Sequence, residues 1–173
     1  VWDADTHAHV ATLEGHTGYV RCLTIYKNKL FSGSWDCTIR VWDADTHAHV
    51  ATLQGHTSEV YCLTIYKNKL FSGSDDRTIR VWDADTHAHV ATLEGHTGYV
   101  RCLTIYKNKL FSGSWDCTIR VWDADTHAHV ATLQGHTSEV YCLTIYKNKL
   151  FSGSDDRTIR VWDADTHAHV ATL

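Results

Sequence analysis

Short runs of β-branched and aromatic residues, separated by polar turns, recur along the whole chain. Residues 20–26 form one such run without a helical period, and the polar residues 27–29 after it predict a hairpin loop. The same pattern predicts three further strands before it begins again, at residues 30–34, 38–42 and 47–53. Four short strands joined by turns predict one antiparallel sheet for each repeat of the pattern.

The pattern repeats every 40 residues, and every second copy is identical letter for letter, so that residues 1–93 and 81–173 are the same string. This period predicts a propeller or a solenoid, because one small sheet cannot bury both of its faces and must stack on its neighbours. Identity across whole copies is typical of a designed gene or of a very recent amplification, and we favour design. Adjacent copies differ at six positions: Glu14/Gln54, Gly18/Ser58, Tyr19/Glu59, Arg21/Tyr61, Trp35/Asp75 and Cys37/Arg77.

Several motifs in each copy resemble the WD40 repeat, namely Gly15-His16, Ser32-Gly33-Ser34 with Asp36, and Thr38-Ile39-Arg40-Val41-Trp42-Asp43. The resemblance covers all four copies and implies an all-β propeller of four-stranded antiparallel blades. It divides the chain into four blades, residues 14–53, 54–93, 94–133 and 134–173. A strand segment, residues 1–13, precedes them and duplicates residues 161–173.

The resemblance also implies a buried hydrogen-bonded set in each blade, made of a histidine, a serine, an aspartate and a tryptophan. A buried indole N–H needs an acceptor, a serine hydroxyl can relay the bond, and a histidine between serine and aspartate satisfies both ring nitrogens. We expect these tetrads to be structural. The four sets are His16, Ser32, Asp36 and Trp42; His56, Ser72, Asp76 and Trp82; His96, Ser112, Asp116 and Trp122; and His136, Ser152, Asp156 and Trp162.

Serine, histidine and aspartate together also suggest a hydrolase triad. A triad requires an exposed nucleophile in a defined geometry, and the chain has no strand–turn–helix nucleophile elbow. We therefore predict that the protein is not an enzyme and that it needs no cofactor.

The alternating positions are expected on the top face, beside the central channel, by resemblance to WD40 proteins. Two interpretations remain open. The exposed aromatic and arginine side chains are typical of a peptide-binding or protein-binding surface. Alternatively, the two blade types complement each other across their junctions through charge and cation–π contacts, which we favour. The residues are Tyr19, Arg21 and Trp35 in one blade type, and Glu59, Tyr61 and Asp75 in the other.

A His-Ala-His pair, such as His47 and His49, is predicted on each outermost strand. Residues at i and i+2 of a strand share a face, so the two imidazoles are weak candidates for metal ligands. A closed structural site needs about four ligands and one strand supplies two. We therefore expect a solvated outer edge and no metal site.

Composition narrows the class of partner. The net charge is −4 and the lysines and arginines are dispersed, which argues against nucleic-acid binding. No apolar run approaches the about 20 residues of a membrane helix, and no signal peptide is visible. The six cysteines form no C-x-x-C pair, which argues against zinc and favours free thiols, as in the bacterial cytosol.

Ring closure is the remaining question. Propellers have about four to eight blades, and four WD40-like wedges should span about half a circle, leaving two apolar faces exposed. We therefore expect a homodimer of eight blades, with a steeper four-bladed monomer as the alternative. Residues 1–13 and 161–173 then compete for one outer slot. We expect the C-terminal copy to hold it, while the N-terminal copy frays or inserts into the partner.

Overall fold

Sixteen strands and no helix make up the computed structural model, which describes residues 1–173. The first blade contains β1 (Val20–Tyr26), β2 (Lys29–Ser34), β3 (Ile39–Asp43) and β4 (His49–Leu53), paired antiparallel in that order. The other three blades repeat this order. Their strands are β5 (Val60–Tyr66), β6 (Lys69–Ser74), β7 (Ile79–Asp83), β8 (His89–Leu93), β9 (Val100–Tyr106), β10 (Lys109–Ser114), β11 (Ile119–Asp123), β12 (His129–Leu133), β13 (Val140–Tyr146), β14 (Lys149–Ser154), β15 (Ile159–Asp163) and β16 (His169–Thr172).

The outermost strand begins later than its sequence predicts. His47 lies before β4, in the left-handed region with φ 62°, and its N–H donates to the Asp43 carbonyl at 2.9 Å. The Asp43 carboxylate also accepts from the Thr46 N–H at 2.7 Å, which closes the turn. The prediction of a strand from His47 is therefore wrong, because side-chain capping extends the turn to this residue.

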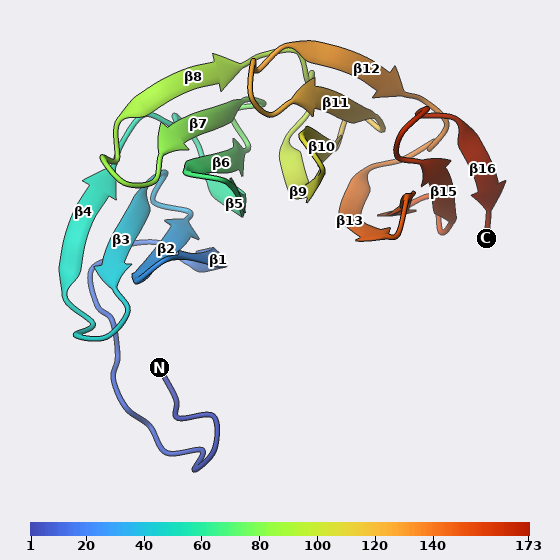
Figure 1. The fold of residues 1–173 in the computed structure, drawn as a ribbon. Helices are drawn as coiled ribbons and strands as arrows, with labels where there is room; N and C mark the ends of the chain where they lie inside the picture. Colours follow the sequence, from blue (N-terminus) through green and yellow to red (C-terminus); the bar gives the residue numbers. More distant parts are fainter.

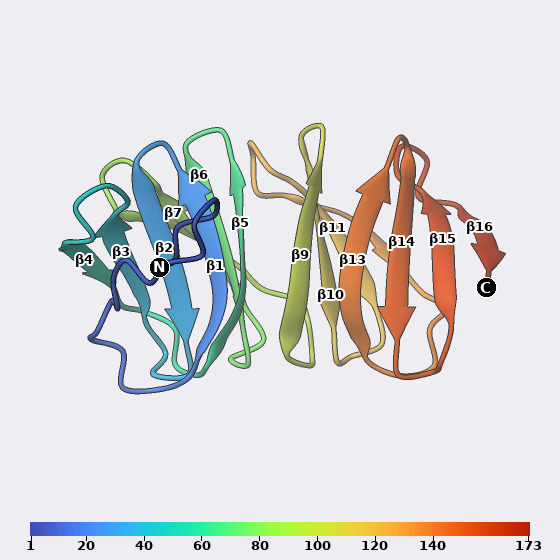
Figure 2. The same ribbon diagram turned by 90° about the horizontal axis from the view of Figure 1, so that it is seen from below.

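The four sheets stand side by side along an open arc (Figure 1). Strands β1, β5, β9 and β13 line its inner side, and β4, β8, β12 and β16 form its rim (Figure 1). Seen from below, the sheets form a row, with the first and last blades at opposite ends (Figure 2). The all-β propeller architecture is confirmed. The chain does not close on itself as a four-bladed ring.

The hydrophobic core lies between the blades. At the first junction, one blade contributes residues such as Phe31 and Ile39, and the next contributes Val60, Leu70 and Trp82. The same arrangement recurs at the other two junctions. Close approach at the inner strand requires a glycine, because a Cβ at Gly33 would lie 2.7 Å from a methyl carbon of Val60.

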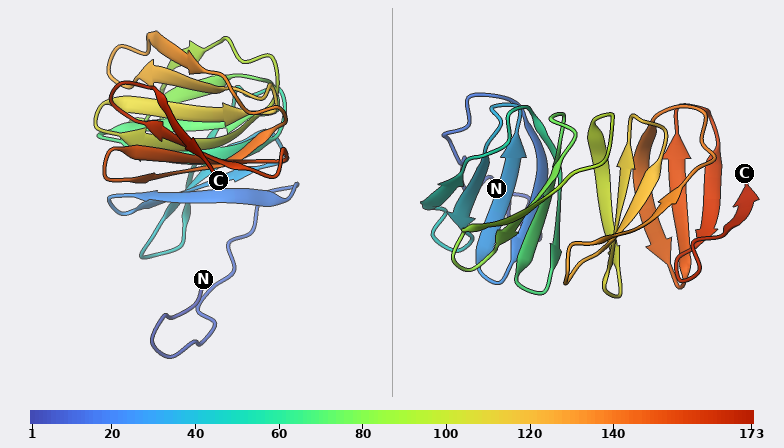
Figure 3. Two further views of the ribbon diagram at one scale, coloured as in Figure 1. Left: turned by 90° about the vertical axis from the view of Figure 1, so that its right-hand side faces the viewer. Right: turned by 90° about the horizontal axis from the view of Figure 1, so that it is seen from above.

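Residues 1–13 lie outside the four sheets, below the first blade (Figure 3, left). The segment is a loose hairpin with a single bridge between Trp2 and His9. Its C-terminal duplicate, residues 161–173, contains the end of β15 and all of β16, which pair in the last blade. The N-terminal copy instead folds back towards the first blade. The structure contains no helix with the length and apolar character needed to cross a membrane.

Candidate functional site

Each blade contains a continuous chain of hydrogen bonds from its tryptophan to its aspartate. In the second blade the Trp82 indole N–H donates to Ser72 Oγ at 2.9 Å. The Ser72 hydroxyl donates to His56 Nε2 at 2.7 Å, and His56 Nδ1–H donates to Asp76 Oδ2 at 2.6 Å. Corresponding bonds in the other blades measure 2.6–2.9 Å. The structure thus brings all four residues of every expected tetrad together.

Several hydrogen-bond donors stabilise the aspartate carboxylate at the end of this series of hydrogen bonds. Burial opposes ionisation of Asp76, but hydrogen bonds from His56 and Thr78 hold the pKa of its carboxyl well below the usual range. The Thr57 N–H adds a bond of 3.1 Å from the loop before the inner strand. This network therefore fastens that loop and the turn at Asp76 onto β6 and β7.

The tetrad serine is unsuited to act as a nucleophile. Ser72 is completely buried, and its oxygen accepts the indole N–H of Trp82. A hydrolytic serine must reach its substrate, with donors placed around the developing oxyanion. The arrangement is suited instead to locking strands and turns together.

This repeated geometry agrees with the family comparison. The family model described as "WD domain, G-beta repeat" matches residues 8–43, 48–83, 88–123 and 128–163. The chain belongs to the WD40 family. No curated protein matches this WD40 chain.

Solved structures similar to this WD40 chain include two computationally designed proteins. It is 39% identical to Ika4, with 88% of this chain and 95% of Ika4 covered and a TM-score of 0.82. With Ika8 the identity is 37%, the coverage 99% of this chain and 54% of that one, and the TM-score 0.89. The WD40 β-propeller domain of Doa1 is 32% identical, with 93% and 55% covered and a TM-score of 0.82. The chain therefore spans about half the length of Ika8 and of the Doa1 domain.

The alternating positions of this WD40 chain meet across the blade junctions. The Arg101 guanidinium lies 3.6 Å from the ring centre of Tyr61 in the preceding blade and 5.3 Å from that of Trp115 in its own. Arg21 has Trp35 beside it at 5.3 Å, but no preceding blade. The structure thus brings these residues into contact between blades, and binding of a peptide on the same face stays a prediction.

Two carboxylates share this surface in the second blade. Burial and the neighbouring charge of Glu59 raise the pKa of Asp75 to about 6, against the opposing attraction of Arg101. One Asp75 oxygen is buried without a hydrogen-bond partner. Tyr19 is 70% exposed, because it belongs to the first blade and faces open solvent.

The two histidines of each outer pair lie in different environments. The His49 ring packs on Trp42, with 5.5 Å between the ring centres, and its Nε2 bonds to Thr52 Oγ1 at 2.9 Å. His87, the counterpart of His47, receives a hydrogen bond from Lys29 of the preceding blade at 3.2 Å. The prediction that each pair shares one strand face is wrong, because the first histidine ends the turn. No group of three or more side chains is placed to hold a metal ion.

The two ends of the arc expose apolar faces. We call the face of the first blade that points away from the second the leading face; it contains Val20, Leu23, Ile25 and Leu30, together with Trp42, which is buried at 4% exposed. Val20 is 50% exposed and Leu23 61%, whereas Val60, the counterpart of Val20, is 0% exposed. The trailing face is the corresponding open face of the last blade; it contains Cys142, Tyr146, Phe151, Ile159 and Leu173.

Ion pairs join neighbouring blades at the end of the sheets where the β1–β2 turn lies, and sequence reasoning missed them. We call this end of the blades the lower rim. Lys27 Nζ lies 2.7 Å from Asp85 of the next blade, and the Lys67–Asp125 and Lys107–Asp165 pairs repeat this contact. The next members of the two series are Lys147 at one end of the arc and Asp45 at the other. Neither has such a partner, and Lys149 turns to Asp163 of its own blade at 2.8 Å. Each lysine lies 58 residues before its aspartate, a spacing that follows from the 40-residue repeat and gives no separate signal in the sequence.

Proposed function

We propose that this WD40 chain is a designed symmetric scaffold that associates head to tail with a second copy into a closed eight-bladed ring. The observation that carries the proposal is the identity of its two open faces with the two halves of an interior junction. The trailing face of the last blade has the letters of the second blade, and the leading face has those of the third. A second copy therefore supplies the surface that each open face already meets inside the chain.

Polar groups at the two ends agree with this arrangement. At the second interior junction, Arg101 lies against Tyr61 and beside Asp75. At the proposed junction, Arg21 of one copy would meet Tyr141 and Asp155 of the other in the same way. Lys147 and Asp45 would likewise complete the series of ion pairs along the rim. Head-to-tail contact thus satisfies aromatic, charged and apolar groups together.

The curvature of the arc and the comparisons both support a ring of eight blades. The four blades form an open arc, and both of its open ends point toward the same empty side of the circle (Figure 1). The chain spans 55% of the Doa1 propeller domain, so a second arc of the same curvature supplies about the missing half. Two copies give a closed assembly without an exposed apolar face, as expected of a symmetric oligomer.

The designed origin and the absence of catalysis are parts of the same proposal. Letter-perfect blades support design, and so does the similarity to two computationally designed proteins. The four tetrad serines are buried and accept the indole N–H of their tryptophans, which supports a structural role for these triad-like sets. No cofactor or nucleic acid is part of this function.

Light scattering on a size-exclusion column tests the association. We expect a single species with twice the 19.6 kDa mass of the chain. Ile159→Asp should give a folded monomer, because this side chain is 46% exposed on the trailing face. The matched variant Ile79→Asp, at a side chain that is 0% exposed between blades, should unfold the chain. A monomeric parent protein at high concentration would contradict the proposal.

A further inference from the structure

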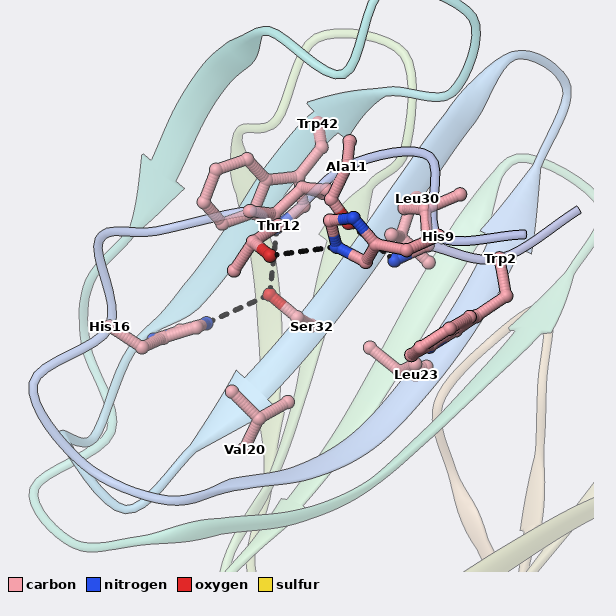
Figure 4. A pocket seen from close by; sticks show the side chains of 12 residues that line it. Trp2, His9, Ala11, Thr12, His16, Val20, Leu23, Leu30, Ser32 and Trp42 are labelled. Atoms are coloured by element: carbon pink, nitrogen blue, oxygen red, sulfur yellow. Dashed lines mark hydrogen bonds between the residues drawn. The ribbon is translucent and has the colours of Figure 1, made fainter. Parts of the chain in front are cut away.

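The N-terminal hairpin lies over the leading face of the first blade. A cavity of about 380 Å³ lies between the hairpin, which contributes Trp2, His9 and Thr12, and the leading face, which contributes Val20, Leu23, Leu30 and Trp42 (Figure 4). The Trp2 and His9 rings pack against each other, with 5.2 Å between their centres. The hairpin therefore occupies the space in front of this face.

The residues that face the hairpin are those that a second copy would need. In the interior, the counterparts Val60, Leu70 and Trp82 are 0–2% exposed, and Leu63 packs beside them against the preceding blade. One leading face cannot contact the hairpin and a trailing face at the same time. We propose that residues 1–13 act as a tethered cap that competes with the second copy for the leading face. This inference rests on the proposed ring, and it assigns to residues 1–13 a role in limiting dimerisation.

The chain that follows the cap is fixed to the first blade at residues 16 and 17. His16 bonds to Ser32 at 2.8 Å and to Asp36 at 2.7 Å, as its counterparts do in the interior blades. The Thr17 N–H also donates to Asp36 at 3.0 Å. Because residue 13 lies only three positions before this anchor, the cap stays at a high effective concentration over the face.

The cap covers its face incompletely, which makes it displaceable. Trp2 is 69% exposed, and Leu23 remains 61% exposed beneath it. A trailing face would bury the same residues as the interior junctions do, where Val60 and Leu70 are 0% exposed. Apolar burial thus favours the second copy once its concentration is high enough. The cap raises that concentration.

Trp2→Ala tests the cap in the full-length chain. The substitution removes the largest cap side chain that lines the cavity, so the Kd of dimerisation should fall about threefold to tenfold, as for release of a closed state that hides the binding site. Val10→Ala is the matched control, because Val10 is 52% exposed and does not line the cavity. Sedimentation equilibrium over a concentration series measures Kd, and far-UV circular dichroism verifies that both variants are folded.

A variant lacking residues 1–13 provides the second measurement, since none of the four sheets contains these residues. It should dimerise at least as tightly as Trp2→Ala. An unchanged Kd in both variants would overturn the cap, and a weaker dimer would assign residues 1–13 to a strand exchanged between copies instead. If no variant and no parent protein dimerises, the proposed ring itself fails.

Discussion

The two open ends of the arc carry the same residues as the junction between the second and third blades. These residues are exposed at the ends and buried at the junction. Val100 is 0% exposed at the junction, whereas Val20, its identical counterpart, is 50% exposed at the end. Ile79 and Ile159 differ in the same way, at 0% and 46%. In a repeat protein of this kind, the neighbouring blade decides whether a side chain belongs to the core.

Polar groups show the same difference through their choice of partner. Lys109 bonds to the Asp165 carbonyl of the next blade at 2.9 Å, and Lys149, without a next blade, bonds to Asp163 of its own. The lysine side chain has a partner in both cases, on the next blade in one and on its own blade in the other. At the open end, the lysine therefore takes a partner from its own blade in place of one from a next blade.

The largest effect should follow from removing a tryptophan between two blades. Trp82→Ala leaves a cavity and frees the Ser72 hydroxyl, and should lower the free energy of unfolding by about 3–5 kcal/mol. Trp42→Ala, on the leading face, removes the same tetrad bond from a side chain that is also buried, at 4% exposed, but that packs against no preceding blade, so it should cost less in the monomeric Ile159→Asp background. Urea denaturation in that background measures both, and equal losses would mean that the neighbouring blade contributes nothing.

A smaller effect is expected from the rim lysines. Lys147→Glu should raise the Kd of the dimer about tenfold, since the closed ring contains this contact twice and each reversal replaces attraction by repulsion. Lys67→Glu, whose Asp125 partner lies within the chain, should leave Kd unchanged and lower stability by less than about 1 kcal/mol. Adding Asp45→Lys to Lys147→Glu should restore the dimer. Failure of this rescue would argue against the head-to-tail register.

The smallest effect concerns pH. Burial and Glu59 raise the pKa of Asp75 to about 6, so the folded chain holds this proton more tightly than the unfolded chain does. The resulting stabilisation is complete below the unfolded pKa of about 3.9 and is lost as the pH rises through about 6. Asp75→Asn should therefore raise the melting temperature relative to the parent at pH 7, and this gain should shrink towards pH 4. A gain independent of pH would exclude titration of Asp75 as its cause.

The sequence was sufficient for the architecture because the strand runs and the tryptophan–aspartate motifs are local signals. The resemblance to WD40 repeats was also sufficient to name the tetrads, whose residues the structure places within hydrogen-bonding distance. Sequence reasoning misplaced His47, because one left-handed residue after a capped turn shifts the start of the outer strand. It missed the pairing of Lys27 with Asp85, since that contact depends on how two blades are offset. The position of residues 1–13 could not be deduced either, as the same letters form a paired strand at the other end.

The two-blade alternation has a consequence for how such a gene can grow. An inserted unit of 80 residues carries, at its two ends, the faces that its new neighbours already present. Duplication or loss of one unit therefore changes the length of the arc without requiring a compensating substitution anywhere else. Unequal recombination between these identical stretches would yield chains that fold and differ only in how far around the circle they reach.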